Sequence, residues 1–147
     1  MSAQHKVCNS FKLEILQGIH DLRVDELRLA LYESTAAINE NTTAYTSTGE
    51  SSGTGYSAGG NEVSVAATFP QLYAYDFAGY AANTVAILDF DDVSFTGSNI
   101  TARYGLIYNA SKSNRAVACI DFGREVGSNL VIQFPEANPR DAIIGII

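Results

Sequence analysis

Three aspartates close together form the group of side chains in this chain best suited to chemistry. If Asp89 and Asp91 lie in one strand, they share a face, because side chains alternate along a strand. Two carboxylates placed in this way could bind a hard cation or act as the acid/base pair of a hydrolase. With Asp92 they match no calcium-loop spacing, and no third cluster of ligands lies nearby in the sequence. Isolated acidic pairs are common on surfaces, so we interpret Asp89, Asp91 and Asp92 as solvated turn or bulge residues.

The other residue types used in catalysis form no recognisable motif. His5 and His20 are the two histidines, and neither has a serine motif or a paired-carboxylate motif beside it in the sequence. The glycine-rich run at 53–60 lacks the Gly-Lys-Ser/Thr of a phosphate-binding loop. We therefore predict that the chain is not an enzyme, and we expect no catalytic, metal-binding or cofactor-binding residues.

Two cysteines, Cys8 and Cys119, lie far apart in the sequence and outside any metal-ligand spacing. They could form one disulfide. Free cysteine is among the most buried residue types, and we interpret Cys119 as a small buried hydrophobe in a strand that is covered on both faces. This interpretation places assembly of the protein in a reducing, cytoplasmic compartment.

Charge is distributed unevenly along the chain, whose formal net charge is -7. No Lys or Arg occurs between Leu29 and Ala102, so the acidic excess falls in that stretch and a basic stripe for nucleic acid is absent. Segregated charge suits registration on a complementary protein partner, and solubility alone is the alternative explanation. No apolar run reaches the roughly 18 to 20 residues of a membrane-spanning helix, and we expect no membrane association and no secretory signal.

The elements that must position these residues are mostly strands. Alternating apolar residues predict a hairpin of two strands between Ile100 and Phe122, joined by the polar turn at 111–114. The same period predicts strands at 11–15 and 25–32, with a short helix at 21–30 as the alternative to the second. Weaker strands follow at 62–67, 130–134 and 142–147. The stretch at 85–95 changes phase at Asp91-Asp92, as a β-bulge would cause.

About seven or eight short strands with Gly/Asn turns indicate an antiparallel β-sandwich or jelly-roll-like fold. With 147 residues, of which 46% are hydrophobic, the chain is long enough for one domain with a core, and we assign residues 1–147 to it.

A long polar segment, residues 34–60, interrupts this pattern. It consists almost entirely of Ser, Thr, Asn, Gly, Ala and Glu, with Tyr45 and Tyr56 as its large apolar side chains. Such a loop points to function, and we interpret it as an extended arm that becomes ordered on a neighbouring subunit. A mobile surface loop with a short helical turn at 36–38 is the alternative.

Aromatic side chains are concentrated in the stretch that follows. Because aromatic residues are enriched at protein interfaces, we predict that part of this group contacts a partner, with burial in the same subunit as the alternative. The candidate protein-contact residues are Tyr45, Tyr56, Tyr73, Tyr75, Phe77 and Tyr80.

The hairpin also carries a resemblance to a known family. Its two strands read ITARYGLIYN and NRAVACIDFG, and they resemble a group of small structural proteins of tailed bacteriophages with the pattern TARGALIYN…NRAVAVLDFG…FPA. The similarity continues, in the order of the family, through NSFKLEIL, GTGYSAGG and VIQFPEANPRDAIIGI, and the polar glycine-rich and LIYN and DFG words are its specific parts. The stretch 68–85 is less typical of the family.

This resemblance implies a virion protein assembled in the host cytoplasm. Our leading hypothesis is a capsid cement or decoration protein that binds the major capsid protein and copies of itself, as a homo-oligomer such as a trimer. The alternative is a tail, neck or fibre component that could bind the host surface. A hydrolase that uses the acidic group is the third and least favoured hypothesis.

Overall fold

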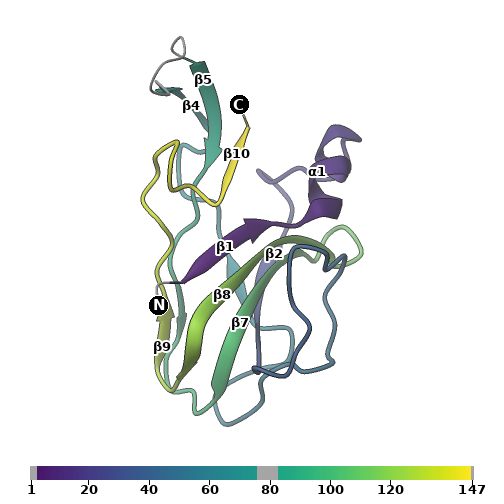
Figure 1. Ribbon diagram of the computed structural model, residues 1–147, viewed down its shortest axis with the longest axis vertical. Coiled ribbons are helices and arrows are strands. Elements are labelled where there is room, and N and C mark those ends of the chain that lie inside the picture. The colour runs from purple at the N-terminus through teal and green to yellow at the C-terminus, as the bar shows by residue number, and fades with distance from the viewer. Residues whose placement is uncertain (1–2, 76–82, 147) are drawn as a thin grey trace.

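The computed structural model describes residues 3–75 and 83–146 (Figure 1). In these ranges the chain forms ten strands and one helix. The elements are β1 (Gln4–Val7), α1 (Asn9–Leu16), β2 (Leu27–Tyr32), β3 (Asn61–Val63), β4 (Gln71–Tyr75), β5 (Asn83–Leu88), β6 (Val93–Phe95), β7 (Thr101–Asn109), β8 (Arg115–Gly127), β9 (Leu130–Ile132) and β10 (Ile144–Ile146). Within the described residues, helix α1 is too short to cross a lipid bilayer.

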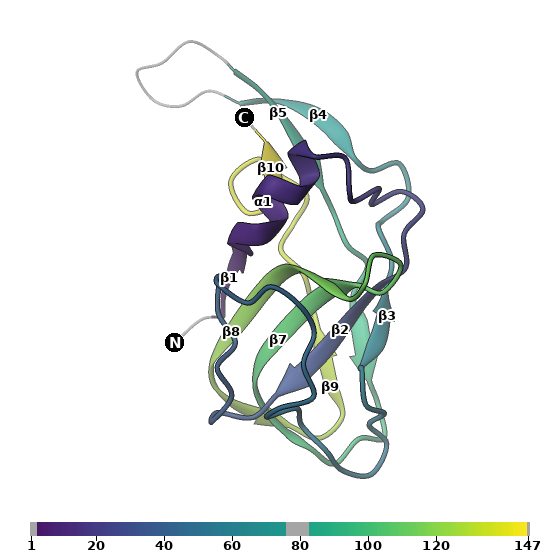
Figure 2. The same cartoon turned by 90° about the vertical axis from the view of Figure 1, so that its right-hand side faces the viewer.

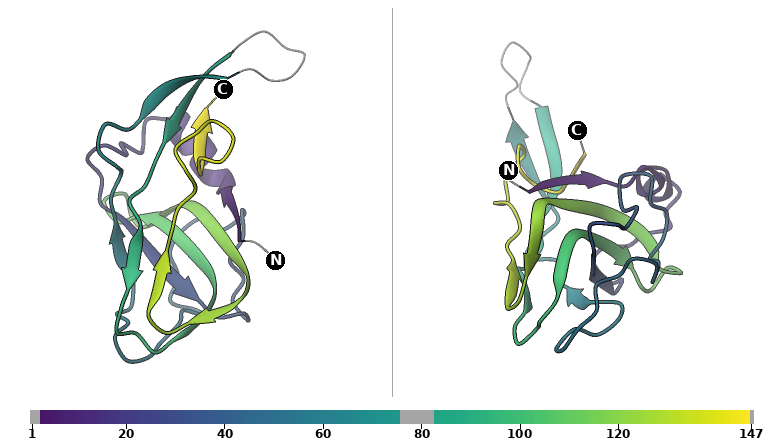
Figure 3. Two further views of the ribbon diagram at one scale, coloured as in Figure 1. Left: turned by 90° about the vertical axis from the view of Figure 1, so that its left-hand side faces the viewer. Right: turned by 60° about the horizontal axis from the view of Figure 1, so that its bottom comes forward.

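The fold is all-β and antiparallel, as the sequence predicts. A five-stranded sheet has the order β1-β8-β7-β2-β3, a three-stranded sheet the order β10-β5-β4, and β6 pairs with β9. The predicted hairpin is confirmed as β7 and β8, and the strand predicted at 25–32 is confirmed as β2, which begins two residues later. In Figures 1 and 3, β4 and β5 project beyond the five-stranded sheet.

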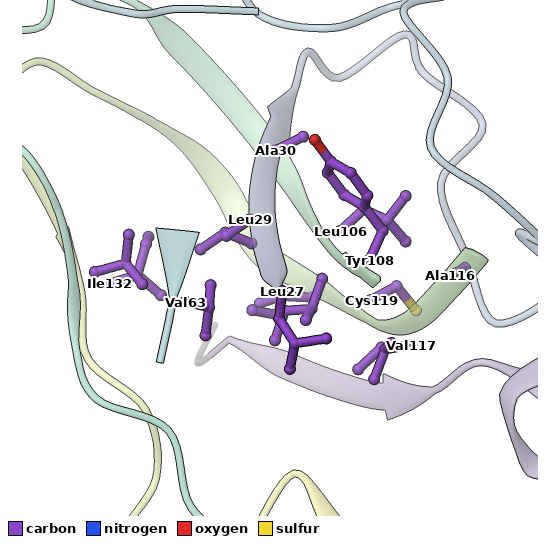
Figure 4. Close-up of a cluster of buried hydrophobic side chains, with 14 of the residues drawn as sticks. Leu27, Leu29, Ala30, Val63, Leu106, Tyr108, Ala116, Val117, Cys119 and Ile132 are labelled. Carbon is purple, nitrogen blue, oxygen red and sulfur yellow. The ribbon is translucent and has the colours of Figure 1, made fainter. Parts of the chain in front are cut away.

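Both faces of the five-stranded sheet are covered, which explains why β2 is buried along nearly its whole length. Figure 4 shows Leu29, Val63 and Ile132 together on one side of β2, where β9 lies, as Figure 3 also shows. On the other side lie Ala30 and Tyr108. Apolar residues of both faces belong to one continuous core.

The segment 34–60 covers the second face of this sheet and packs on its own chain. The arm that becomes ordered on a neighbouring subunit stays a prediction. The Tyr45 ring stacks on Tyr108 at 4.8 Å between ring centroids. The Ser51 N–H donates to the Leu31 carbonyl at 2.9 Å, and the Ser51 hydroxyl donates to the Thr101 carbonyl at 2.7 Å. These contacts hold the segment against the five-stranded sheet of its own chain.

A single carboxylate organises the inside of this loop. Glu50 accepts hydrogen bonds from the hydroxyl groups of Tyr45 at 2.6 Å and Tyr56 at 2.8 Å, and from the Gly59 N–H at 2.7 Å. Gly60 has a positive φ of 75°, and a side chain there would collide with the Leu29 carbonyl. The glycine-rich run therefore serves close approach of the loop to β2.

Two predictions of local structure are wrong. Residues 9–16 form helix α1, because Phe11 and Ile15 lie one turn apart on a shared face while Leu13 is exposed. At 85–95 there is no bulge within one strand. The chain leaves the three-stranded sheet after Leu88 and enters the β6–β9 pair at Val93, and this transfer between sheets produces the change of phase.

Candidate protein-contact surface

Helix α1 and the three-stranded sheet bring together apolar side chains that remain open to solvent (Figure 2). In α1, Phe11 is buried, whereas Leu16 in the last turn is 85% exposed. In the sheet, Leu72 pairs with Ala86, and Ala86 pairs with Ile146, so these three side chains share one face. Leu72 is 73% and Ile146 54% exposed. We call Leu16, Leu72 and Ile146 the apolar surface.

Two clefts beside β10 belong to this surface. One, of about 270 Å³, is lined by residues that include Phe11, Ile15, Leu88 and Ile144. The other, of about 280 Å³, is lined by residues that include Leu16 and Ile146. Exposed apolar groups gathered around a groove are typical of protein–protein contact sites.

The strands of this sheet contain no charged residue in their sequences QLYAY, NTVAIL and IGI. The charged residues that line its clefts, Lys12, Asp21 and Arg23, come from α1 and the segment that follows it. Strands β4 and β10 are the two outer strands of the sheet, and an outer strand offers unpaired backbone groups to an incoming segment. The arrangement is suited to binding an apolar or extended protein segment.

The structure separates the six predicted contact residues into three groups. Tyr45 and Tyr56 are half-buried, and their rings stack within their own chain, Tyr56 on Phe95 at 5.8 Å. These two tyrosines are therefore not part of the partner contact that we propose below. Tyr73 lies in β4 next to Leu72, and its half-buried ring stacks on Phe69 at 6.5 Å. Tyr75 ends β4.

The remaining two predicted residues, Phe77 and Tyr80, lie outside the described residues. Sequence reasoning missed Leu16 and Ile146, because they come from opposite ends of the chain and only the fold brings them together. For Leu16 a signal existed: Phe11 and Ile15 have helical spacing, which leaves Leu16 beside the buried face, at the end of the helix.

A buried polar network that includes His20 lies under α1. The sequence predicts no catalytic motif around either histidine. Glu14 accepts a hydrogen bond from Arg115 Nη1 at 2.6 Å, and its Oε2 lies 3.9 Å from His20 Nε2. Asn109 Nδ2 donates to Asp25 Oδ2 at 2.7 Å and lies 3.0 Å from His20 Nδ1. Because an amide nitrogen only donates, Nδ1 accepts, and the neutral ring carries its proton on Nε2.

A histidine between two carboxylates can transfer protons in enzymes, but here the ring is enclosed. The side chain of His20 is fully buried and packs on Phe11 at 4.8 Å between ring centroids. Burial lowers the pKa of His20, against the opposing effect of Glu14. The hydrogen bonds and ion pairs of this network connect α1, the segment before β2 and the β7–β8 turn.

The three aspartates of the acidic group lie where the chain passes between sheets. The Asp91 N–H donates to the Ser64 carbonyl at 2.9 Å, and Asp92 Oδ1 accepts from the Phe134 N–H at 3.1 Å. Burial, with a smaller contribution from Asp91 and Asp92, raises the pKa of Asp89. Within residues 3–75 and 83–146, no group of three or more His, Cys, Asp or Glu side chains could hold a metal ion.

No protein-family model, curated protein or solved structure matches the chain.

Proposed function

We propose that this chain is a structural protein of a tailed-phage virion, and that it acts as capsid cement by binding the major capsid protein and stabilising the head. The observation that carries the proposal is the apolar surface: Leu16, Leu72 and Ile146 are exposed, and Leu16 and Ile146 also line apolar clefts. A soluble protein that keeps such a surface open uses it for association. The resemblance of the β7–β8 hairpin to phage virion proteins supports the viral setting.

The function proposed is therefore binding and not catalysis. Partners would be the major capsid protein and further copies of the chain, joined as a homo-oligomer such as a trimer. A cement subunit adds binding energy to a lattice that already exists. The protein would be made in the host cytoplasm and become part of the virion.

A deletion experiment tests this proposal. Particles that lack the protein should still form heads, but those heads should lose DNA at a lower temperature than wild-type heads. Adding back the purified chain should restore the release temperature. Unchanged head stability in the deletion, with loss of host attachment or of tail joining, would reject cement.

A tail, neck or fibre component is the second candidate, and one observation favours it. Strands β4 and β5 project from the body of the molecule, with Leu72 exposed and Tyr73 beside it (Figures 1 and 3). A projecting hairpin is suited to reaching a distant surface. Copy number separates the two candidates: hundreds of copies per particle would indicate the head, and about three to twelve the tail, because closed rings contain few subunits.

A further inference from the structure

The two cysteines of the sequence, Cys8 and Cys119, meet in the core although they are far apart along the chain. Lys6 of β1 pairs with Cys119 of β8, so these two side chains share a face of the five-stranded sheet. Cys8 lies two residues beyond Lys6 and has an extended backbone, with φ -66° and ψ 140°, so its side chain returns to that face. The Cys8 N–H donates to the Val117 carbonyl at 2.9 Å, so Cys8 lies opposite Val117, which is two residues from Cys119 and on the same face of β8.

The two thiols differ in access and in acidity. Cys8 is fully buried, whereas Cys119 is 7% exposed and lines a cleft of about 130 Å³ together with Lys6, Glu40 and Tyr104. The interaction with Cys8 lowers the pKa of Cys119 against the opposing effect of burial, while the interaction with Cys119 and burial raise the pKa of Cys8. Cys119 is thus the more exposed of the two thiols and the one whose pKa is lowered, and the thiolate is the reactive form of cysteine.

We propose that Cys8 and Cys119 form an intramolecular disulfide when the protein meets a small-molecule disulfide as oxidant. The Cys119 thiolate attacks one sulfur of the oxidant and releases the first small thiolate, which leaves a mixed disulfide on Cys119. Cys8 then loses its proton to solvent, and its thiolate attacks the Cys119 sulfur and releases the second small thiolate. Two cysteine thiols are oxidised and one small disulfide is reduced to two thiols, so electrons and atoms balance.

The bond would lock the N-terminal part of the chain to the centre of the fold. Cys8 immediately precedes α1, and Cys119 lies in β8, which pairs with both β1 and β7. A cross-link between residues so far apart in the sequence removes much of the chain entropy of the unfolded state. It would also fix the position of α1, whose last residue, Leu16, belongs to the apolar surface. The inference does not depend on the proposed function.

Oxidation of the purified full-length chain tests the inference. After incubation with oxidised glutathione, we expect the intact mass to fall by about 2 Da, and the denatured chain to have lost both free thiols. The midpoint of thermal unfolding should rise by roughly 5–15 °C and return on reduction with dithiothreitol.

Single substitutions provide the controls. Cys8→Ser and Cys119→Ser should show no rise in melting temperature under the same treatment, and Cys8→Ala and Cys119→Ala replace them if the polar hydroxyl prevents folding. The inference is wrong if excess oxidant leaves both thiols free, yields only a glutathione adduct on Cys119, or produces dimers between chains. It is also wrong if the internal bond forms and the melting temperature does not rise.

Discussion

Two carboxylates and an imidazole are buried together under α1. They belong to Glu14, Asp25 and His20, whose side chains are almost inaccessible to solvent. Burying charge is costly unless each charged group has a partner. Glu14 has Arg115, at 2.6 Å, and Asp25 has Lys112, at 3.7 Å, with the Asn109 amide between Asp25 and the imidazole. Since these residues come from α1, the segment before β2 and the β7–β8 turn, their pairing couples three separate parts of the fold.

The protonation of His20 gives a prediction for stability against pH. Protonation would place a second proton on Nδ1, where the Asn109 amide already donates, and burial also lowers the pKa of His20 below its usual 6.5. As pH falls, the unfolded state therefore takes up this proton before the folded state does. The stability that neutral His20 contributes is complete above pH 6.5 and is lost as pH falls from there through the lowered pKa.

Denaturant unfolding between pH 7.5 and 5 measures this loss, which one proton limits to about 1.4 kcal/mol per pH unit. His20→Gln should flatten the part of the curve that His20 causes. His5, whose pKa burial also lowers, is the matched control, because His5→Gln should leave the His20 part in place. Identical slopes in wild type and His20→Gln would show that His20 does not titrate differently on folding.

At the scale of elements, sequence reasoning succeeded where the alternation is long, and it failed where the alternation is short or the contacts are distant in sequence. Alternation along β7 and β8 extends over enough residues to exclude a helix, and the hairpin was predictable. At 11–15 the alternation rested on three apolar residues, of which Phe11 and Ile15 fit a helix equally well. The position of the loop 34–60 on the sheet could not be predicted. Its Ser51 bonds to Leu31 and Thr101, and no sequence pattern links these residues to the loop.

Glu50 gives a prediction for this loop in the isolated protein. Glu50→Ala would leave three donors, the hydroxyl groups of Tyr45 and Tyr56 and the Gly59 N–H, without their acceptor. A buried donor without a partner costs about 1–3 kcal/mol, so amide exchange and proteolysis within 34–60 should become much faster, while β7 and β8 change less. Glu33→Ala, at an exposed position, is the control. Rapid exchange of the Ser51 amide in the wild-type chain would contradict the packed loop.

Gly60 gives a second prediction, for the approach of this loop to β2. Gly60→Ala combines an unfavourable positive φ with a collision against the Leu29 carbonyl, and should lower the free energy of unfolding by at least about 2 kcal/mol. Gly97→Ala has nearly the same φ, 73°, with nothing near the added carbon, so it should cost only about 1 kcal/mol. Urea unfolding of both variants measures the difference, and equal losses would show that the close approach is not essential.

At the scale of the whole molecule, the three-stranded sheet differs from the rest of the surface because its strands contain no charged residue. In the part of the chain that the structure describes, these Lys and Arg side chains lie within 4 Å of a carboxylate: Lys6, Arg23, Arg28, Arg103, Lys112 and Arg115. The net charge of -7 therefore leaves acidic groups in excess on the surface, and these repel other copies and any acidic partner. The uncharged strands of the three-stranded sheet are where a partner approaches without that repulsion, and there Leu72 and Ile146 are exposed.

This difference in charge gives the last prediction, which concerns the apolar surface. Leu16→Asp and Leu72→Asp each place a charge where we expect contact, so binding of the purified chain to particles that lack it should weaken at least tenfold, about 1.4 kcal/mol. Both side chains are mostly exposed, and the melting temperature should change by less than about 4 °C. Val131→Asp is the control, because Val131 is 48% exposed on β9, away from α1. Co-sedimentation measures binding, and wild-type affinity in both leucine variants would show that the partner binds elsewhere.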